Sequence, residues 1–477
     1  MLFNSFEFVF FFITITFTYF LLPFQYRIWL LLIGSYFFYM RWEWVYIFLI
    51  VGQTLINYTC SWKIGNSENK REKKFWLVFA LASTLGMLFF FKYYNFANDS
   101  VKTLFNEIGF SYMVPHLNII LPVGISFYTF QTLSYTIDVY RNRCKVETHF
   151  GHFALFVSFF PQLVAGPIER ANRLLPQFKR RNRFDIDRLV EGGKLIVWGL
   201  FKKVVIADRL AEYVDRVYAH ADYYSGASLA LATYFFAFQI YCDFSGYSDI
   251  AIGSARILGY DIMENFRLPY LASSISDFWR RWHISLSTWF RDYLYFPLGG
   301  NRVGIEQWIF NIYMVFLISG LWHGANWTFV IWGGLHGTFY LMESLGKRFK
   351  ERFLTKVRSH HPIIRLIQIF VTFHLVVFAW IFFRANNLSD AWLIVSRIVT
   401  DPLGQLYLGP SQLTTFISIC LIGLLVLVQI LQYRGRLSLY FSMPHLSRKI
   451  RWAGYWGMVM AIALLGKGGN EFIYFQF

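Results

Sequence analysis

Long apolar runs recur along the whole chain, and they constrain its fold more than any other feature. Of the 477 residues, 56% are hydrophobic and only 15% are charged, whereas soluble domains carry about 25% charged residues. A helix needs about 20 mostly apolar residues to cross a bilayer. The sequence therefore predicts an all-α, polytopic integral membrane protein with about ten to twelve transmembrane or re-entrant helices. The clearest apolar runs are 8–22, 76–91, 229–240, 363–383, 416–431 and 458–465.

The net charge of +17 lies in the loops between these runs. Cytoplasmic loops of membrane proteins are enriched in Lys and Arg, so we expect the most basic loops to face the cytoplasm. These loops are 63–74, 170–188, 347–365 and 434–451. Two stretches with a single basic residue between them, 93–118 and 400–413, should face outward. Because the basic residues form no independent domain, nucleic acid is not an expected partner.

The segment 141–170 is interrupted in a way that ordinary spanning helices are not. It has basic residues at both ends and is broken by Pro161, Gly166 and Pro167, so we expect it to enter and leave on the cytoplasmic side. Broken helices are tolerated in membranes only where protein or a watery cavity satisfies the backbone groups. The segment therefore predicts a central cavity.

The chain reads as a single membrane domain over residues 1–477. We expect peripheral helices at 1–118, a catalytic core at 119–345 that holds most of the unusual polar residues, and C-terminal helices with an aromatic tail at 346–477. The four cysteines are far apart in the sequence, so neither a disulfide nor a metal site is expected.

His323, in the stretch 320–327, places an ionisable imidazole between two apolar runs. Ionisable residues inside membranes are expensive and usually functional. The run 308–321 before it has only about 14 residues, near 21 Å as a helix, so we expect His323 inside the membrane at a turn marked by Gly320 and Gly324. Partial desolvation favours the neutral imidazole that a general base requires. A structural histidine bonded to neighbouring backbone is the alternative.

A second histidine, His283, lies in the stretch 274–297, which we predict to be one helix capped by Ser274. On such a helix Arg280, His283, Ser287 and Arg291 share one polar stripe. The stripe fits a helix that lines a wet cavity, and it fits equally well an amphipathic helix at the interface with its arginines toward lipid phosphates.

His336 lies 13 residues beyond His323. On one continuous helix the two histidines would be about 20 Å apart on different faces, so we predict a supporting or structural role for His336. Neither histidine has the spacing of a zinc site, and no metal is predicted.

Carboxylates also occur at apparent membrane depth, at Asp243, Asp249 and Glu169. We expect them to hold the core together, with counterions drawn from the arginines 256, 267 and 280. A proton or ion relay is the functional alternative.

The sequence has no serine nucleophile elbow and no phosphate-binding loop. One strong base without an activated nucleophile suits direct transfer of an acyl group from a thioester to a hydroxyl, with His323 accepting the hydroxyl proton. Trp322, Asn326 or backbone N–H groups are the candidates for stabilising the oxyanion. A transporter or polysaccharide export component without acyl chemistry is the alternative from another class.

These motifs resemble the membrane-bound O-acyltransferase superfamily, and within it the bacterial branch that modifies polysaccharides such as alginate. The resemblance extends over nearly the whole chain. It rests on 121–131, 161–168, 243–249, 278–300, 320–327 and the aromatic motif 472–477.

The resemblance implies an all-helical acyltransferase with a central funnel, His323 as catalytic histidine and His283 at the second characteristic polar position. It implies acetyl-CoA from the cytoplasm as donor, no permanently bound cofactor, and a location in the bacterial cytoplasmic (inner) membrane. A periplasmic or cell-surface acetyltransferase would be the partner, and an alginate-like exopolysaccharide, cellulose or peptidoglycan the acceptor. A related branch moves D-alanine to teichoic acid, but the motifs here look nearer the acetylating branch.

Tyr474 carries the only hydroxyl in the aromatic motif 472–477. It can be interpreted as a covalent relay that accepts the acetyl group and passes it outward. The alternative, which we favour from the sequence, is an aromatic anchor at the membrane interface.

Overall fold

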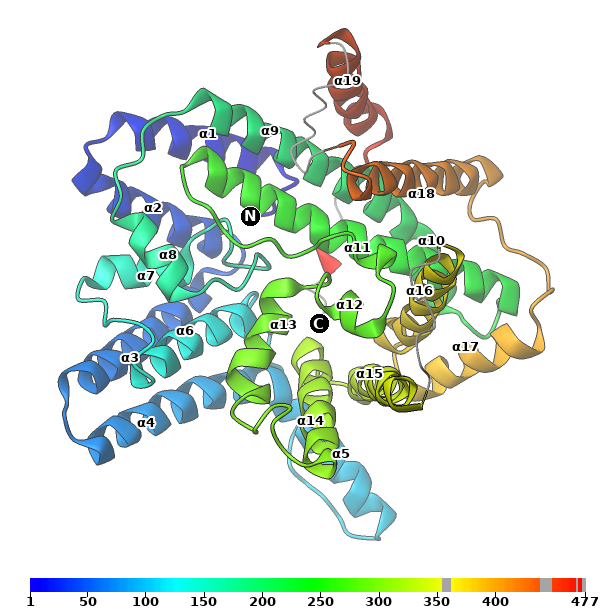
Figure 1. Cartoon of the computed structure of the whole chain (residues 1–477), viewed down its shortest axis with the longest axis horizontal. Coiled ribbons are helices and arrows are strands. Elements are labelled where there is room, and N and C mark those ends of the chain that lie inside the picture. The colour runs from blue at the N-terminus through cyan, green and yellow to red at the C-terminus, as the bar shows by residue number, and fades with distance from the viewer. Residues whose placement is uncertain (354–361, 438–447, 469–470, 474–477) are drawn as a thin grey trace. The chain divides into compact units, whose positions relative to one another are not determined.

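Every regular element in the described part of the chain is a helix, which confirms the predicted all-α architecture (Figure 1). The computed structural model describes all residues except 354–361, 438–447, 469–470 and 474–477. The chain forms two units, residues 1–192 with 251–263 and residues 193–250 with 264–477. The expectation of a single membrane domain with its core at 119–345 stays a prediction.

Six helical segments among the described residues are long and apolar enough to cross a membrane, so the protein is polytopic as predicted. They are Trp44–Asn66, Lys70–Glu107, Gly226–Ile257, Ile305–His323, Pro362–Arg384 and Gln412–Tyr433. Helix α1 is apolar but shorter. The total of ten to twelve, which included re-entrant helices, and the central funnel stay predictions.

The helices of the first unit are α1 (Phe6–Leu21), α2 (Phe24–Met40), α3 (Ile47–Asn66), α4 (Lys70–Leu88), α5 (Tyr94–Glu107), α6 (Ile125–Tyr140), α7 (Phe150–Ser158) and α8 (Ala171–Phe178). Helices α9 (Ile186–Leu200) and α11 (Gly226–Ile257) contribute residues to both units. The second unit also contains the π-helical turn η3 (Phe201–Ala207), α10 (Asp208–Ala219), α12 (Ile275–Trp279), α13 (Ile284–Phe290), α14 (Ile305–His323), α15 (Trp327–Phe353), α16 (Pro362–Arg384), α17 (Leu388–Thr400), α18 (Gln412–Tyr433) and α19 (Arg448–Leu465).

Side-chain hydrogen bonds join α3, α4 and α6 in the first unit. Asn57 of α3 donates to the Thr84 hydroxyl of α4 at 2.9 Å and accepts from the Thr136 hydroxyl of α6 at 2.9 Å. All three residues are buried. Between apolar helices in lipid, such polar contacts provide specificity that apolar packing alone does not. Asn57 therefore fixes the register of these three helices.

The broken segment is buried between α7 and α8, since residues 159–169 are all shielded from solvent without forming a helix. Side chains supply partners for its backbone and for the end of α7. Gln162 donates to the Phe156 carbonyl at 2.9 Å, and the Phe160 N–H donates to the Ser35 hydroxyl at 3.1 Å. The Glu169 carboxylate accepts the N–H of Met263. Protein groups thus satisfy these parts of the irregular backbone, as expected for such a segment at membrane depth.

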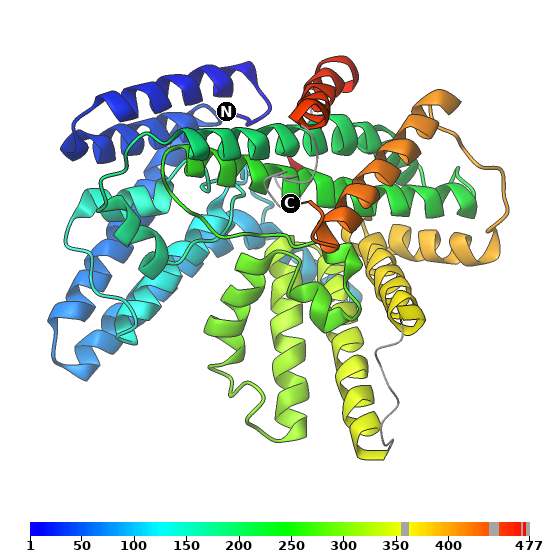
Figure 2. The same cartoon turned by 45° about the horizontal axis from the view of Figure 1, so that its top comes forward.

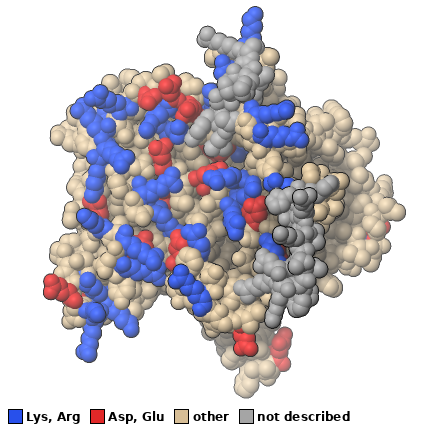
Figure 3. All heavy atoms as spheres, viewed as in Figure 1, with Lys and Arg blue, Asp and Glu red and all other residues tan. Residues whose placement is uncertain are grey.

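Lys and Arg predominate over Asp and Glu on the face drawn in Figure 3. The stretch 170–188 contributes exposed basic residues at positions 173, 179, 180, 181 and 183. Their exposure is compatible with the cytoplasmic side that we predict from the positive-inside rule. The orientation in the membrane stays a prediction.

We expect Asn57→Ala to destabilise the protein by about 1–2 kcal/mol, because two interhelical hydrogen bonds are lost. The measurement is the unfolding temperature of the purified protein in detergent. Asn66→Ala is the matched control, since Asn66 ends the same helix and is exposed. Equal unfolding temperatures for the two variants would contradict this role of Asn57.

Candidate active site

Helices α14 and α15 form a closely packed hairpin, visible in both views (Figure 1, Figure 2). The packing depends on two glycines. A Cβ on Gly320 would lie 2.2 Å from the Phe329 carbonyl oxygen, and a Cβ on Gly333 would lie 2.2 Å from the Phe316 carbonyl oxygen. Small residues at such positions allow two helix backbones to approach. The hairpin places His323 at the last position of α14, with 3% of its surface exposed.

The prediction that the helix before His323 is too short to cross a membrane was wrong. Helix α14 has 19 residues, about 28 Å at 1.5 Å per residue, which matches the hydrocarbon core. The apolar run is shorter than the helix because the first turn of α14 contains the polar residues Glu306 and Gln307. His323 thus ends a full-length span.

Aromatic rings surround His323. Its ring centroid lies 5.0 Å from Trp322, 5.0 Å from Trp332 and 5.4 Å from Phe383. All three contacts are edge-on. The imidazole is therefore held in one orientation and away from bulk water.

His283 lies at a break between α12 and α13, so the prediction of one helix over 274–297 was wrong. Ser274 caps α12 as predicted, but the helix ends at Trp279. The N–H of Ile284 then donates to the Asn265 carbonyl at 3.0 Å, which draws the chain aside. His283 adopts φ 44°, a left-handed conformation that is strained for a residue with a side chain and is common at functional sites.

The predicted polar stripe does not form, because this break separates its members. His283 is fully buried, whereas Arg280 and Arg291 are exposed. Ser287 is half-buried, donates to the Trp282 carbonyl at 3.2 Å, and lines a small pocket of about 100 Å³ beside Phe316.

The two buried histidines come together although 40 positions separate them. Their ring centroids are 6.3 Å apart, and Trp322 contacts both, at 5.9 Å from His283 and 5.0 Å from His323. Phe244 of α11 also contacts His283, with ring centroids 4.7 Å apart. The structure thus joins the two residues that we singled out from the sequence.

His336 lies on α15, whereas His323 ends α14, so the two histidines are not on one continuous helix. The chain turns between α14 and α15, and Trp332 contacts both histidines, at 5.0 and 4.9 Å. His336 is fully buried against Trp279, and its nitrogens have no hydrogen-bond partner among the described residues. Its surroundings suit the predicted supporting role.

Asn326 occupies the turn between the two helices. Its side-chain amide donates to the Asn386 carbonyl at 3.0 Å, and its oxygen accepts the N–H of Thr328 at 3.0 Å. Both ends of the amide thus hold the start of α15. Trp322, in contrast, contacts both histidine rings. Tyr474 lies outside the described residues.

The predicted arginine counterions were wrong, because two adjacent lysines of η3 bind the aspartates of α11. Lys202 pairs with Asp249 at 2.8 Å, and Lys203 pairs with Asp243. The arginines bind elsewhere, Arg256 to Glu191 and Asp261 and Arg267 to Glu264. Sequence reasoning missed both lysines, although two charges within the otherwise apolar run 195–207 were a usable signal.

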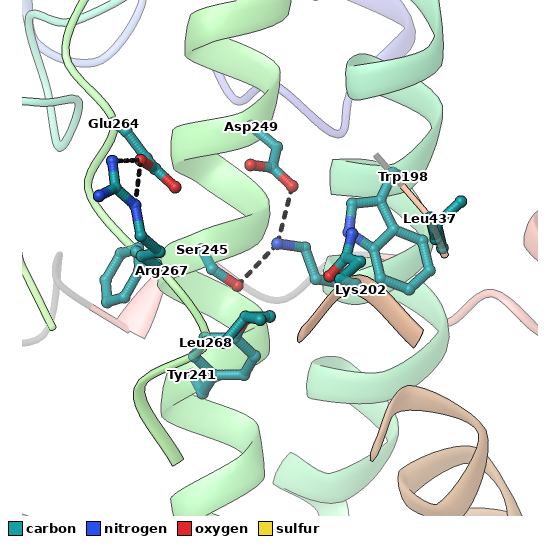
Figure 4. Close-up of a pocket in the computed structure, with 11 residues that line it drawn as sticks. Trp198, Lys202, Tyr241, Ser245, Asp249, Glu264, Arg267, Leu268 and Leu437 are labelled. Atoms are coloured by element: carbon teal, nitrogen blue, oxygen red, sulfur yellow. Dashed lines mark hydrogen bonds and ion pairs between the residues drawn. The ribbon is translucent and has the colours of Figure 1, made fainter. Parts of the chain in front are cut away.

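Lys202 projects into a pocket of about 310 Å³ (Figure 4). Its ammonium group donates to Ser245 at 2.8 Å and pairs with Asp249, while Arg267 and Glu264 form a second ion pair in the lining. Phe266 lines the same pocket and stacks on His283, with centroids 6.5 Å apart and planes at 19°. One aromatic side chain therefore separates the pocket from the histidine pair.

Among the described residues, no group of three or more His, Cys, Asp or Glu side chains is arranged to hold a metal ion.

Residues 145–384 match the family described as MBOAT, membrane-bound O-acyltransferase family. The chain belongs to this family. It is 42% identical to the probable alginate O-acetylase AlgI of Pseudomonas aeruginosa over 80% of this chain and 71% of that one. It is 38% identical to the peptidoglycan O-acetyltransferase of Helicobacter pylori, over 78% and 73%. It is 27% identical to the teichoic acid D-alanyltransferase of Bacillus subtilis, over 57% and 70%.

As a membrane-bound O-acyltransferase, the protein is an enzyme that transfers acyl groups, and the alternative of a transporter without acyl chemistry does not hold. Both histidines and the two lysines of η3 fall within the matched region.

We expect His336→Phe to leave the unfolding temperature of this O-acyltransferase unchanged or higher and to retain acyl transfer, because the imidazole packs against aromatic side chains such as Trp279 and Trp332. His336→Ala opens a cavity in the aromatic core and should cost about 2 kcal/mol or more. Unfolding temperature and acyl transfer would be measured on both variants. Loss of transfer in a stable His336→Phe protein would instead assign a chemical role to the imidazole.

Proposed function

We propose that the protein takes an acetyl group from cytoplasmic acetyl-CoA and passes it across the membrane for O-acetylation of a polysaccharide, with His323 as general base. The observation that carries the proposal is the buried histidine pair, with ring centroids 6.3 Å apart, at the end of a spanning helix. A general base must be held against the reacting hydroxyl and away from competing water. The aromatic surround of His323 meets both needs.

In the transfer step, the acceptor hydroxyl attacks the thioester carbonyl while His323 accepts its proton. The new O–C bond forms, the tetrahedral intermediate collapses, and the C–S bond breaks. The departing thiolate takes the proton back from His323, so that the enzyme returns to its starting state. The indole N–H of Trp322 or backbone N–H groups near the turn are the proposed donors to the oxyanion. His283 orients the neighbouring rings from its fixed, left-handed backbone.

The pocket beside Lys202 supports acetyl-CoA as the donor. Its cations are already paired, Lys202 with Asp249 and Arg267 with Glu264, so its interior carries no large excess of positive charge. Such a site suits the neutral pantetheine arm, whose amides form hydrogen bonds, better than the phosphates of the nucleotide. The thioester end would then lie toward Phe266 and the histidines.

The relatives support a polysaccharide as the final acceptor. Those with the higher identity are named for alginate and peptidoglycan O-acetylation, so we propose an alginate-like exopolysaccharide first, with cellulose and peptidoglycan as further candidates. A periplasmic or cell-surface acetyltransferase would complete the transfer, and the bacterial cytoplasmic membrane is the proposed location. D-alanyl transfer to teichoic acid is the second candidate function, favoured by the weaker match to a D-alanyltransferase.

We expect His323→Ala to lower acetyl transfer about 10²- to 10⁴-fold, the usual contribution of a general base. The assay uses purified protein in proteoliposomes with radiolabelled acetyl-CoA, and it follows thioester consumption and labelled product. His220→Ala is the control, because His220 is exposed. Equal turnover in the wild type and His323→Ala would sink the proposal, and activity with a D-alanyl carrier thioester alone would favour the second candidate.

Filling the donor pocket should weaken donor binding without removing the base. We expect Leu268→Trp to raise the KM for acetyl-CoA about tenfold, the equivalent of about 1.4 kcal/mol, with a smaller change in kcat. Leu268→Met is the control, since it conserves volume at the same lining position. An unchanged KM in the tryptophan variant would place the donor elsewhere.

A further inference from the structure

The small pocket beside Phe316 is formed by the same two helices that present the histidine pair. Helices α13 and α14 lie side by side (Figure 1, Figure 2). His283 directly precedes α13, and His323 ends α14. The pocket has a volume of about 100 Å³, and both helices contribute to its lining, α13 with Leu286, Ser287 and Phe290 and α14 with Val315, Phe316 and Ser319.

The pocket lies one helical turn from each histidine. Ser287 follows His283 by four positions, and its N–H donates to the His283 carbonyl at 2.9 Å. Ser319 precedes His323 by four positions on α14. Residues four apart on a helix lie on one face, with Cβ atoms about 5–6 Å apart. The two helices thus bring the pocket next to the histidine pair.

This spacing fits the geometry of acyl transfer. A general base lies about 2.6–3.2 Å from the hydroxyl oxygen that it deprotonates. That oxygen lies about 3–3.5 Å from the carbon that it attacks. The acyl carbon is therefore expected about 6 Å from the imidazole of His323, which is the distance of one helical turn. An acyl group placed for reaction thus has the pocket within reach.

The volume of the pocket limits the size of this group. A dry apolar cavity of about 150 Å³ in another protein holds the six carbons of benzene, so about 100 Å³ suits about four heavy atoms. With the carbonyl included, an acetyl group has three heavy atoms, a propionyl group four and a butyryl group five. The rings of Phe290 and Phe316 are at most 9% exposed, and close packing of this kind leaves them little room to give way.

The lining also disfavours a charged acyl group. None of the described residues that line the pocket is a carboxylate. Trp279 completes the lining, and its buried indole N–H has no hydrogen-bond partner among the described residues, so a carbonyl that reached it would satisfy a donor. A D-alanyl thioester carries an ammonium group, which would lose its water here without gaining a counterion.

We propose that the pocket beside Phe316 holds the acyl group of the donor and restricts it to short, uncharged chains, with acetyl preferred. Leu286 and Ser319 are then specificity-determining residues. This inference rests on the proposed function and deepens it, because it assigns the acyl group to this pocket and leaves the pantetheine arm in the pocket beside Lys202. The two pockets border the histidine pair through different residues, one through Phe266 and the other through the serines.

Leu286→Ala should enlarge the pocket and admit longer chains. We would measure kcat/KM for acetyl-, propionyl- and butyryl-CoA in proteoliposomes. One extra methylene in an apolar pocket changes kcat/KM about 10- to 200-fold. We therefore expect the wild type to prefer acetyl-CoA to butyryl-CoA by about 10²-fold, and Leu286→Ala to lower this preference by about tenfold or more.

Phe310→Ala is the matched control, since it also removes a large apolar side chain but Phe310 is 51% exposed on α14. It should leave the chain-length preference unchanged. Val315→Ala enlarges the same pocket with a smaller loss of packing, and it replaces Leu286→Ala if that variant does not fold. An unchanged preference in the enlarged pocket, or a wild type that uses butyryl-CoA as well as acetyl-CoA, would overturn the inference.

The proposed function fails on a different result. If acetyl-CoA consumption persists in His323→Ala, the proposed base is wrong whatever the chain-length preference. If consumption is lost in His323→Ala while Leu286→Ala keeps the wild-type preference, the proposed function stands and only the acyl pocket is refuted.

A carboxylate in the pocket should reverse the selection against charge. The donors for this experiment are acetyl- and D-alanyl-pantetheine thioesters. We expect Ser319→Asp to raise the ratio of D-alanyl to acetyl transfer about tenfold or more, because the ammonium group gains a charge-assisted hydrogen bond, which is about twice as strong as a neutral one. Ser319→Asn is the control, since it has the same size without the charge. An equal rise in both variants, or a rise in neither, would show that the acyl group lies elsewhere.

Discussion

Each charge inside this protein has to find its partner inside the protein, because the surrounding hydrocarbon offers neither water nor counterions. The second unit meets this constraint with the lysines of η3 and the aspartates of α11. The pairing decides where α11 lies against η3. It leaves Lys202 facing a pocket and Lys203 facing a chain segment. Helix α11 contacts the histidine pair through the aromatic side chain of Phe244, which needs no counterion.

The sequence was sufficient for the features that depend on composition and on local chemistry. Apolar runs predicted four of the six candidate spanning helices, Ser274 predicted the start of α12, and the cost of an imidazole among apolar residues singled out His283 and His323. The remaining features depend on contacts between distant residues. The Ile284 N–H that follows the break after α12 donates to the carbonyl of the distant Asn265, and a π-turn sets the register of the lysines. Neither contact leaves a periodic trace in the chain.

Helix α11 connects the parts of the site because each of its faces contacts a different part. At about 100° per residue, Tyr241 and Ser245 share one face, which lines the pocket. Asp243 and Tyr247 share another face, which binds the segment 471–473. Phe244 points between these faces toward His283. A single helix thus touches the pocket beside Lys202, His283 and the segment 471–473 within seven residues.

The three sets of contacts made by α11 depend on one another. The faces of α11 are fixed relative to one another by helical geometry, so a rotation that improves one contact worsens the other two. The lysines of η3 oppose such a rotation from two directions, because Lys202 binds Ser245 and Asp249 while Lys203 binds Asp243. The paired charges therefore keep the helix in the one orientation in which the pocket, His283 and the segment are served together.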